Sequence, residues 1–211
     1  MPSKPSIGII GSGNVGSALQ EGLVRAGYDV DAAGHEPERV AQLARNAEVV
    51  ILAVPFDQRE DALRSAGDLT GKILVDATNA MDKNMGYALD LKQSGAEQLA
   101  QKAARGAKVV KAFNTVFAQN MSTGKVQGER LTALIAGDDE PAKRTVMQLA
   151  KDLGFDPVDA GPLAQARYLE TLGVLNINLA YKAGMGPAMG FRLVHEGSAV
   201  SAPTRETLRN R

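Results

Sequence analysis

The sequence predicts an α/β fold: a doubly wound, mostly parallel sheet followed by a small C-terminal helical segment. A short apolar run, Ile7–Ile10, leads into closely spaced glycines and then into a segment with helical apolar spacing. Short apolar runs continue to alternate with helical segments as far as Phe155, which is typical of βαβ units. The alternation stops near Gly161, where one long helical segment begins.

The turn after the first strand has the spacing of a dinucleotide-binding site. Gly11, Gly13 and Gly16 follow the pattern G-x-G-x-x-G between a predicted strand and a predicted helix, and that context makes the pattern specific. We expect Gly11 to make the turn, Gly13 to let the backbone approach a pyrophosphate, and Gly16 to bring helix and strand together. The helix N-terminus would add N–H groups and a partial positive charge. The predicted fold is therefore Rossmann-like, and the alternative is a glycine-rich turn without a nucleotide.

The remaining elements are predicted in chain order from apolar runs and turn residues. Strands are expected at residues 28–33, 49–53, 73–76, 108–112, 131–136 and 155–159. Helices are expected at residues 38–46, 57–66, about 91–104 and 163–182, and a further helix starts at 138–141. Asp57 is the candidate cap of the helix that ends at Ala66.

The chain is expected to divide into three parts. Residues 1–160 form the NAD(P)-binding domain, and residues 161–196 form a helical segment that closes an acceptor site. Residues 197–211 lack periodicity and are expected to be a mobile tail.

Composition excludes several classes of protein. The net charge is zero, which indicates no nucleic-acid partner, and the longest apolar run, residues 49–54, is too short to span a membrane. The sequence has no cysteine, and its two histidines, His35 and His195, form no metal-binding motif, so no metal site is expected. No apolar signal core precedes the first strand, which favours a cytoplasmic location.

The end of the second strand determines which dinucleotide is favoured. An acid there would bind the adenosine ribose and repel a 2′-phosphate, and Gly34 occupies that place. Arg39, one turn into the next helix, could pair with a 2′-phosphate, and His35 could stack on adenine or contact the phosphate. Glu36 argues mildly against an anion, and a solvated Arg39 is the alternative interpretation. The balance favours NADP over NAD.

Three further strand ends carry candidate ligand contacts. The segments at positions 54–56, 76–79 and 114–117 stand at the ends of predicted strands. In open α/β sheets ligands bind outside the carboxyl ends of the strands, so these segments are expected to border the cofactor crevice. For Asp76 and Asn79 ordinary turn and cap chemistry is an equal alternative.

The long C-terminal helix predicts an assembly. It is apolar on nearly every side between Leu172 and Ala180, and such a helix is buried on more than one face. We expect one face to pack on the sheet domain and another on a second copy of the chain. A two-fold homodimer with its active sites near the interface would result.

Two segments and the C-terminal region resemble a known family. Residues 111–116, Lys-Ala-Phe-Asn-Thr-Val, and 159–163, Asp-Ala-Gly-Pro-Leu, together with the glycine pattern, resemble the NADPH-dependent reductases of coenzyme F-420, an 8-hydroxy-5-deazaflavin. Residues 164–193 are similar to the same family, including the turn at 184–186. The resemblance implies hydride transfer between NADP(H) and the deazaflavin, bound opposite the nicotinamide. The stretch before Val49 is shorter than in the family, which implies that an edge strand is missing.

The resemblance also assigns roles by position. The cofactor contacts would be Ser12, Asn14 and Val15 at the pyrophosphate, His35 and Arg39 at the 2′-phosphate, and Val54, Pro55 and Ala118 beside the nicotinamide. The deazaflavin would contact Asn114, Arg167, Thr171, Gly173 and, near its ring, Met185. Hydride transfer between ring cofactors needs stacking and exclusion of water rather than a side-chain nucleophile. No catalytic residue is therefore assigned.

Two alternatives stay open. The same scaffold could reduce another acceptor: a flavin, a ferric chelate through a flavin, or a small imine or keto acid. A reductase of imines or keto acids would need a Lys, His or Asp near the nicotinamide. The second alternative is a non-catalytic module that binds NADP(H), which would not need the C-terminal segment to shape a second pocket.

Overall fold

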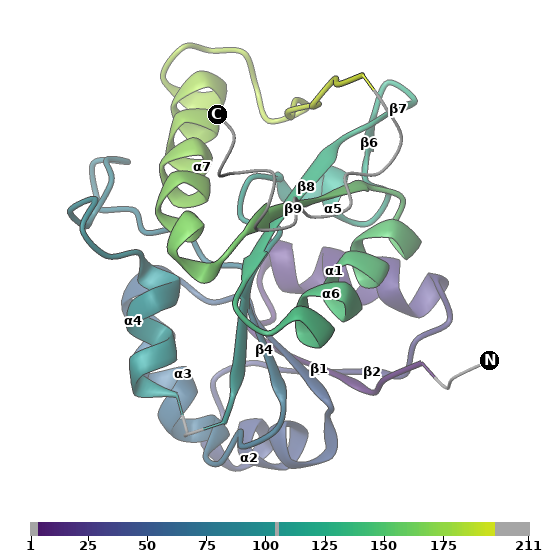
Figure 1. Ribbon diagram of the computed structural model, residues 1–211, viewed down its shortest axis with the longest axis vertical. Coiled ribbons are helices and arrows are strands. Elements are labelled where there is room, and N and C mark those ends of the chain that lie inside the picture. Colours follow the sequence, from purple (N-terminus) through teal and green to yellow (C-terminus); the bar gives the residue numbers. More distant parts are fainter. Residues whose placement is uncertain (1–3, 104–105, 197–211) are drawn as a thin grey trace, which may run out of the picture.

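A computed structural model describes residues 4–103 and 106–196 of the chain and shows a doubly wound α/β fold (Figure 1). Its central sheet has seven strands in the order β2-β1-β3-β4-β5-β8-β9. All neighbouring strands are parallel except β5 and β8, which are antiparallel. The predicted mostly parallel, Rossmann-like sheet is therefore confirmed, and β2 forms one of its edges.

The strands and helices have the following bounds. The sheet contains β1 Ile7–Ile10, β2 Val30–Ala33, β3 Val49–Leu52, β4 Ile73–Asp76, β5 Lys108–Lys111, β8 Thr132–Gly137 and β9 Asp156–Gly161. The helices are α1 Asn14–Arg25, α2 Pro37–Asn46, α3 Arg59–Ala66, α4 Gly95–Lys102, α5 Ala118–Met121, α6 Glu140–Asp152 and α7 Ala166–Tyr181. A small hairpin pairs β6, Lys125–Val126, with β7, Glu129–Arg130.

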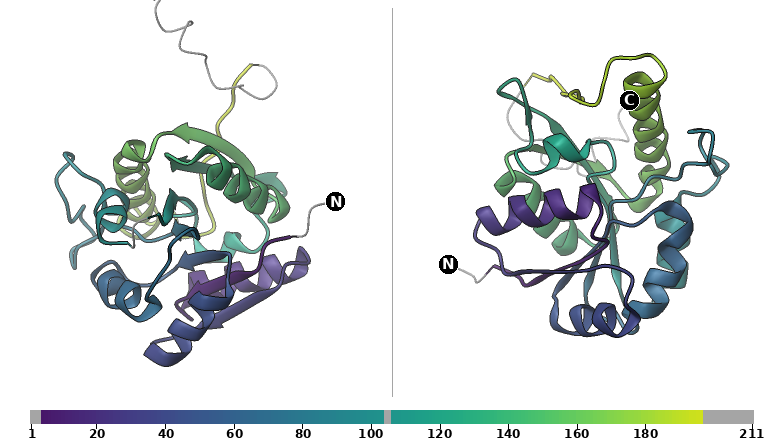
Figure 2. Two further views of the ribbon diagram at one scale, coloured as in Figure 1. Left: turned by 60° about the horizontal axis from the view of Figure 1, so that its bottom comes forward. Right: turned by 180° about the vertical axis from the view of Figure 1, so that it is seen from behind.

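Two hydrophobic clusters cover the two faces of the sheet. Leu19 and Leu149, from α1 and α6, belong to one cluster, and Leu43 and Leu99, from α2 and α4, belong to the other. Figure 2 shows the helices arranged around the sheet. β1 and β3 are buried along their whole length because both faces are covered. Leu163, just before α7, joins the second cluster, so the C-terminal segment packs on the sheet domain.

Several local predictions need correction. Asp57 does not cap a helix, because it lies within a 3-10 turn, Phe56–Gln58, and α3 begins only at Arg59 without a side-chain cap. The helix expected at about 91–104 begins at Gly95, where Ser94 and Glu97 form a capping box, and residue 104 lies outside the described residues.

Two further corrections concern short elements. The loop expected at 113–121 contains the single-turn helix α5. The predicted helix 163–182 is a 3-10 turn, Leu163–Gln165, followed by α7.

The predicted tail, 197–211, lies outside the described residues. Within residues 4–103 and 106–196, no helix is long and apolar enough to cross a membrane.

Candidate functional site

The turn between β1 and the first residues of α1 contains Gly11, Gly13 and Gly16, and the surroundings of the three glycines differ. Gly11 has a φ of +117°, and a Cβ there would stand 2.3 Å from the carbonyl oxygen of Ala53. A Cβ on Gly16 would stand 1.8 Å from the carbonyl oxygen of Gly11. A Cβ on Gly13 would meet nothing within 4 Å, and its φ of −76° suits any residue. Gly11 and Gly16 are therefore required by the chain's own packing, whereas only a ligand would require Gly13.

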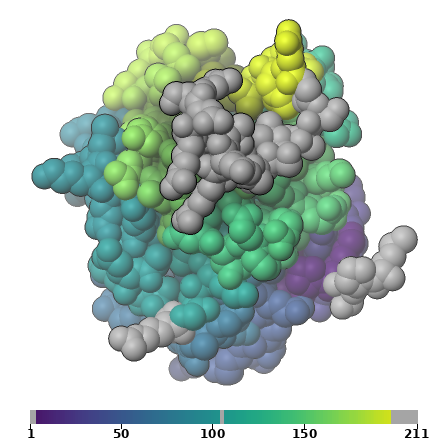
Figure 3. Space-filling view, in the orientation of Figure 1, coloured from purple at the N-terminus to yellow at the C-terminus, as the bar shows by residue number. Residues whose placement is uncertain are grey.

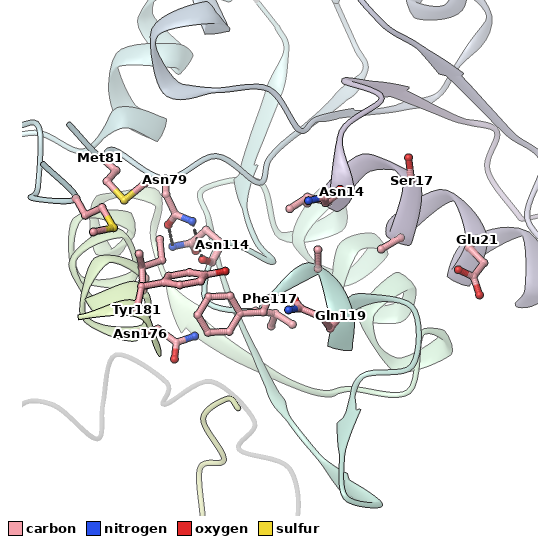
Figure 4. A pocket seen from close by; sticks show the side chains of 17 residues that line it. Asn14, Ser17, Glu21, Asn79, Met81, Asn114, Phe117, Gln119, Asn176 and Tyr181 are labelled. Atoms are coloured by element: carbon pink, nitrogen blue, oxygen red, sulfur yellow. Dashed lines mark hydrogen bonds between the residues drawn. The ribbon is translucent and has the colours of Figure 1, made fainter. Parts of the chain in front are cut away.

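A cleft of about 750 Å³ extends from this turn across the carboxyl ends of β4 and β5 to α7 (Figure 4). Its lining comes from the start of α1, the loops after β4 and β5, α5 and α7. The lining residues are Asn14, Val15, Ser17, Ala18, Glu21, Asn79, Met81, Met85, Asn114, Val116, Phe117, Ala118, Gln119, Gly173, Asn176, Ile177 and Tyr181. This set places one continuous cavity along the edge of the sheet where ligands bind in open α/β folds.

Asn79 and Asn114 join the loops after β4 and β5 at the middle of the cleft. The Asn79 side-chain amide donates to the backbone carbonyl of Asn114 (3.0 Å), and the Asn114 amide donates to Oδ1 of Asn79 (3.2 Å). The Asn114 amide also donates to the carbonyl of Leu169 on α7 (2.8 Å). A Cβ on Gly173 would stand 2.4 Å from Oδ1 of Asn79. Glycine at 173 thus allows α7 to lie directly against the asparagine pair.

Backbone strain precedes Asn114. Phe113 has a φ of +66° and is 1% exposed, a conformation that costs a non-glycine residue about 1–3 kcal/mol. Its ring packs on Phe155, with 6.1 Å between the centroids, which holds the strained residue in place. The turn directs the chain out of β5 so that Asn114 reaches the cleft.

A buried cluster of charges fixes the elements behind the asparagine pair. Lys111, at the end of β5, contacts Asp76 (3.1 Å) and Glu170 of α7 (3.3 Å) and donates to the carbonyl of Thr78 (2.6 Å). Lys111, Asp76 and Glu170 are fully buried. Burial alone would raise the pKa of Asp76, but Lys111 and two hydrogen bonds from Thr78 hold it below the ordinary value. The cluster therefore ties β4, β5 and α7 together beneath the cleft.

Glu170 also holds the loop that forms one cleft wall. Its carboxylate accepts from the backbone N–H groups of Gly95 (2.9 Å) and Ala96 (3.1 Å) and from the hydroxyl of Tyr87 (3.0 Å). Burial and the neighbouring Glu170 charge raise the pKa of Tyr87, which keeps its hydroxyl protonated. The loop that carries Met81 and Met85 into the cleft is therefore anchored at its C-terminal end.

A second cavity, of about 410 Å³, lies at the other end of the glycine turn. It is bordered by the ends of β1, β2 and β3 and by α3, with Gly34, His35 and Val54 among its lining. The Glu36 carboxylate stands 3.4 Å from where a Cβ on Gly34 would be. Arg39 forms an ion pair with Asp31 of β2. Glu36 and Arg39 therefore lie close in sequence to the cavity residues Gly34 and His35, and Arg39 already has a partner in Asp31.

The charge of the large cleft is low. The titratable residues in its lining, within the described part of the chain, are Glu21 and Tyr181. The side chain of Glu21 is 67% exposed, and Tyr181 is 58% exposed. The cleft therefore offers neutral polar groups and apolar surface rather than a buried acid, base or cation.

Comparison with known proteins finds a family match over the N-terminal part of the chain. Residues 6–48 and 38–80 match the family described as NADP oxidoreductase, coenzyme F420-dependent. A protein of Arthrobacter sp. FB24, assigned as an F420-dependent NADP reductase, superposes with a TM-score of 0.81 at 28% identity, covering 90% of this chain and 100% of the other. Residues 6–80 thus match the F420-dependent NADP oxidoreductase family in sequence, and the fold of the chain is similar to that of a protein assigned as such a reductase.

Other relatives carry different names. Metalloreductase STEAP3 of Rattus norvegicus is 37% identical over 182 residues, which is 80% of this chain and 36% of the relative. The chain thus spans about a third of the length of the curated relatives it matches. An imine reductase of Pseudomonas sp. shares 20% identity and superposes with a TM-score of 0.61 over 86% of this chain and 64% of that one, which shows a shared fold.

The family-derived site residues divide between the two cavities. Asn14, Val15, Ala118, Asn114 and Gly173 line the large cleft, and His35 and Val54 line the second cavity. Gly11, Ser12, Gly13 and Gly16 form the turn between them. Pro55 precedes the 3-10 turn Phe56–Gln58 and lies in neither lining.

Three of the expected deazaflavin contacts lie outside the large cleft lining. Arg167 forms an ion pair with Glu97 of α4 (3.1 Å) and donates to the carbonyl of Leu91 (3.1 Å). The hydroxyl of Thr171 donates to the carbonyl of Arg167 (3.1 Å). Met185 is 64% exposed. Arg167 thus fastens α7 to α4 in this structure.

Sequence reasoning did not single out Asn176 or Tyr181 as contacts, although both line the cleft. Phe117, in the strand-end segment 114–117 that was expected to border the crevice, lines it as well. The rings of Phe117 and Tyr181 meet edge to face, with 5.9 Å between their centroids. Helical spacing carries part of this signal, because Gly173, Asn176 and Ile177 lie three and four residues apart on one face of α7.

Proposed function

We propose that this protein transfers a hydride between NADP(H) and an 8-hydroxy-5-deazaflavin, coenzyme F-420, bound opposite the nicotinamide. The observation that carries the proposal is the single cleft that runs from the glycine turn to α7. It offers room for two ring systems side by side, and thioether, aromatic and neutral amide groups border it. Such walls suit flat, uncharged rings.

The dinucleotide is proposed to span both cavities. Its pyrophosphate would lie over Gly13 at the N-terminus of α1, where a side chain would find open space. The adenosine would enter the second cavity, and the nicotinamide would lie beside Val54, Pro55 and Ala118. NADP is the preferred cofactor in this proposal, with His35 and Arg39 at the 2′-phosphate.

The chemistry needs positioning rather than acid–base catalysis. A hydride moves directly from C4 of the dihydronicotinamide to the acceptor ring when the two are stacked. The electron pair passes to a nitrogen of the reduced ring, which takes one proton from solvent and needs no side-chain acid. The large cleft supplies such a site but lines it with no lysine, histidine or aspartate within the described residues. This lining supports a ring acceptor over an imine or a keto acid, which would need a proton donor or a cation.

A second candidate acceptor is a flavin, alone or as a relay to a ferric chelate. It is favoured by the 37% identity to a protein named metalloreductase over 80% of this chain. Flavins and deazaflavins share a flat tricyclic ring, so the same cleft suits both. The two candidates differ in turnover, not in the shape that they require.

The test compares acceptors directly. NADPH and enzyme are mixed with oxidised deazaflavin, with flavin mononucleotide, or with flavin mononucleotide plus a ferric chelate, and the absorbance of each acceptor is followed. Fast bleaching of the deazaflavin, abolished in Gly13→Val, is the expected result. Turnover with flavin or iron alone would favour the second candidate. NADPH binding without turnover of any acceptor would indicate a non-catalytic NADP(H)-binding module.

We also propose a homodimer formed through α7. Tyr168 and Leu175 are 60% and 50% exposed and stand on the same face as the half-buried Leu172 and Leu179. α7 forms part of the outer surface at the top of the molecule (Figure 3). The spacing of three and four residues makes one apolar stripe. Sedimentation at micromolar concentration is expected to give a dimer that Leu175→Arg dissociates, and a wild-type monomer would refute the proposal.

The cytoplasmic location stays a prediction.

A further inference from the structure

The orientation of the Asn114 amide is fixed by its neighbours. Its nitrogen donates to two oxygens, the carbonyl of Leu169 at 2.8 Å and Oδ1 of Asn79 at 3.2 Å. A flipped amide would place oxygen against oxygen at both contacts. The remaining atom, Oδ1 of Asn114, is buried and has no hydrogen-bond partner among the described residues.

Asn176, on α7, repeats this arrangement. Its side-chain nitrogen donates to the carbonyl of Thr115 at 3.0 Å, which fixes the amide in the same way. Oδ1 of Asn176 is also buried without a partner in the described part of the chain, and the residue is 2% exposed. An unpaired buried carbonyl oxygen is destabilising, and two of them in the lining of one cleft require an explanation.

The surroundings of the two oxygens limit what could pair with them. The described lining of the cleft contains no lysine or arginine, so neither oxygen is arranged to assist in holding an anion. Tyr181 stands between Asn114 and Asn176 in the view of Figure 4. That ring is 58% exposed and packs edge to face on Phe117. A ligand that binds at this end of the cleft would meet two acceptors among neutral amide, aromatic and aliphatic side chains.

We propose that Asn114 and Asn176 recognise the N–H edge of the acceptor ring, so that the acceptor is a planar heteroaromatic with an imide N–H such as the pyrimidinedione shared by flavins and deazaflavins. The inference rests on the proposed function, because it assigns the acceptor to the α7 end of the cleft. It excludes keto acids and other carboxylate acceptors, whose charge would face two carbonyl oxygens. It also gives a reason for the asparagine at each position, since an amide can fasten itself to the backbone through nitrogen and still present oxygen.

The test removes the donor from the ligand rather than the acceptor from the protein. Binding of riboflavin, of 8-hydroxy-5-deazariboflavin and of their N3-methyl derivatives is measured by ring fluorescence, with NADP⁺ present. N3-methylation is expected to weaken binding to the wild-type protein about 10-fold or more, since one hydrogen bond is lost and one buried acceptor stays unpaired. In the double variant Asn114→Ala/Asn176→Ala, which lacks both proposed acceptors, the methyl group is expected to change the affinity less than about 3-fold.

Asn178 provides the matched control. Its Oδ1 is also buried and unpaired among the described residues, but the residue does not line the cleft. Asn178→Ala is therefore expected to keep the full sensitivity to N3-methylation. Equal binding of methylated and unmethylated rings by the wild-type protein would overturn the inference and leave the proposed function intact. Methyl-sensitive binding without hydride transfer would support the inference and overturn the proposed function. Failure of every ring to bind would overturn the inference and the proposed function together.

Discussion

Replacing Gly13 by valine separates binding from folding more cleanly than any other change in the glycine turn. Gly13 is the N-cap of α1, with φ −76° and ψ −173°, an extended conformation that valine adopts readily. A Cβ there would meet nothing within 4 Å. The added side chain would instead fill the space above the α1 N-terminus, where we expect the pyrophosphate.

The two effects differ in size. Glycine and serine are better N-caps than an aliphatic residue, which costs the variant roughly 0.5–1.5 kcal/mol. Valine also restricts the unfolded chain more than glycine does, which stabilises the folded state by roughly 0.4–1 kcal/mol. The net change in the free energy of unfolding should stay within about 1 kcal/mol, or about 4 °C in Tm for a chain of this size. Loss of NADPH affinity should reach at least about 100-fold, which is about 2.7 kcal/mol.

Calorimetric titration with NADPH and a thermal melt on the same sample measure both quantities. Gly16→Ala is the matched control, because its Cβ would stand 1.8 Å from the carbonyl oxygen of Gly11. That variant should lose about 3 kcal/mol or more of stability. A folded Gly13→Val protein with unchanged NADPH affinity would refute the assignment of the turn to the pyrophosphate.

Three further predictions concern specificity, packing and pH. Arg39→Ala should weaken NADPH binding by about 1–3 kcal/mol and leave NADH almost unchanged, because the lost bond is charge-assisted; equal losses in calorimetric titrations would show that Arg39 serves only its ion pair. Gly173→Ala should lower Tm by about 2–12 °C in calorimetry, because its Cβ would overlap the asparagine pair and cost about 1–3 kcal/mol; an unchanged Tm would contradict that close packing. Asp76→Asn should cost about 1.5–3 kcal/mol in urea unfolding at pH 7, because Lys111 loses one of its two charged partners and keeps Glu170. The pKa of Asp76 is depressed in the folded state, so its contribution is present above about pH 4. The gap between wild type and this variant should therefore narrow as the pH falls further, and a constant gap would contradict the ion pair.

The alternation of strands and helices could be predicted because it rests on local patterns. Apolar runs located every strand of the main sheet, and the glycine spacing located the first turn. The cap at Ser94 was missed although its partner Glu97 stands three residues on, the spacing of a capping box. The antiparallel pairing of β8 with β5 was not predicted. The direction of a strand depends on the path of the intervening chain and not on the strand's own residues.

The candidate site was harder to predict because it depends on contacts between distant segments. Asn79, Asn114 and Gly173 lie far apart in the sequence, and nothing local indicates that α7 rests on the asparagine pair. Arg167 was assigned to the acceptor by family position, but in the folded chain it fastens α7 to α4 through Glu97. A charged residue's sequence context does not tell whether its partner is a ligand or another side chain.

The central claim is that a hydride passes directly from the nicotinamide to a ring held in the cleft beside α7. The most direct measurement uses NADPH carrying deuterium at the transferred position of C4, with the reduced deazaflavin analysed by mass spectrometry. Carbon 5 of a deazaflavin keeps the hydrogen it receives, so the account predicts one deuterium in each reduced ring formed in ordinary water. Reduced deazaflavin that contains only solvent hydrogen would contradict direct transfer.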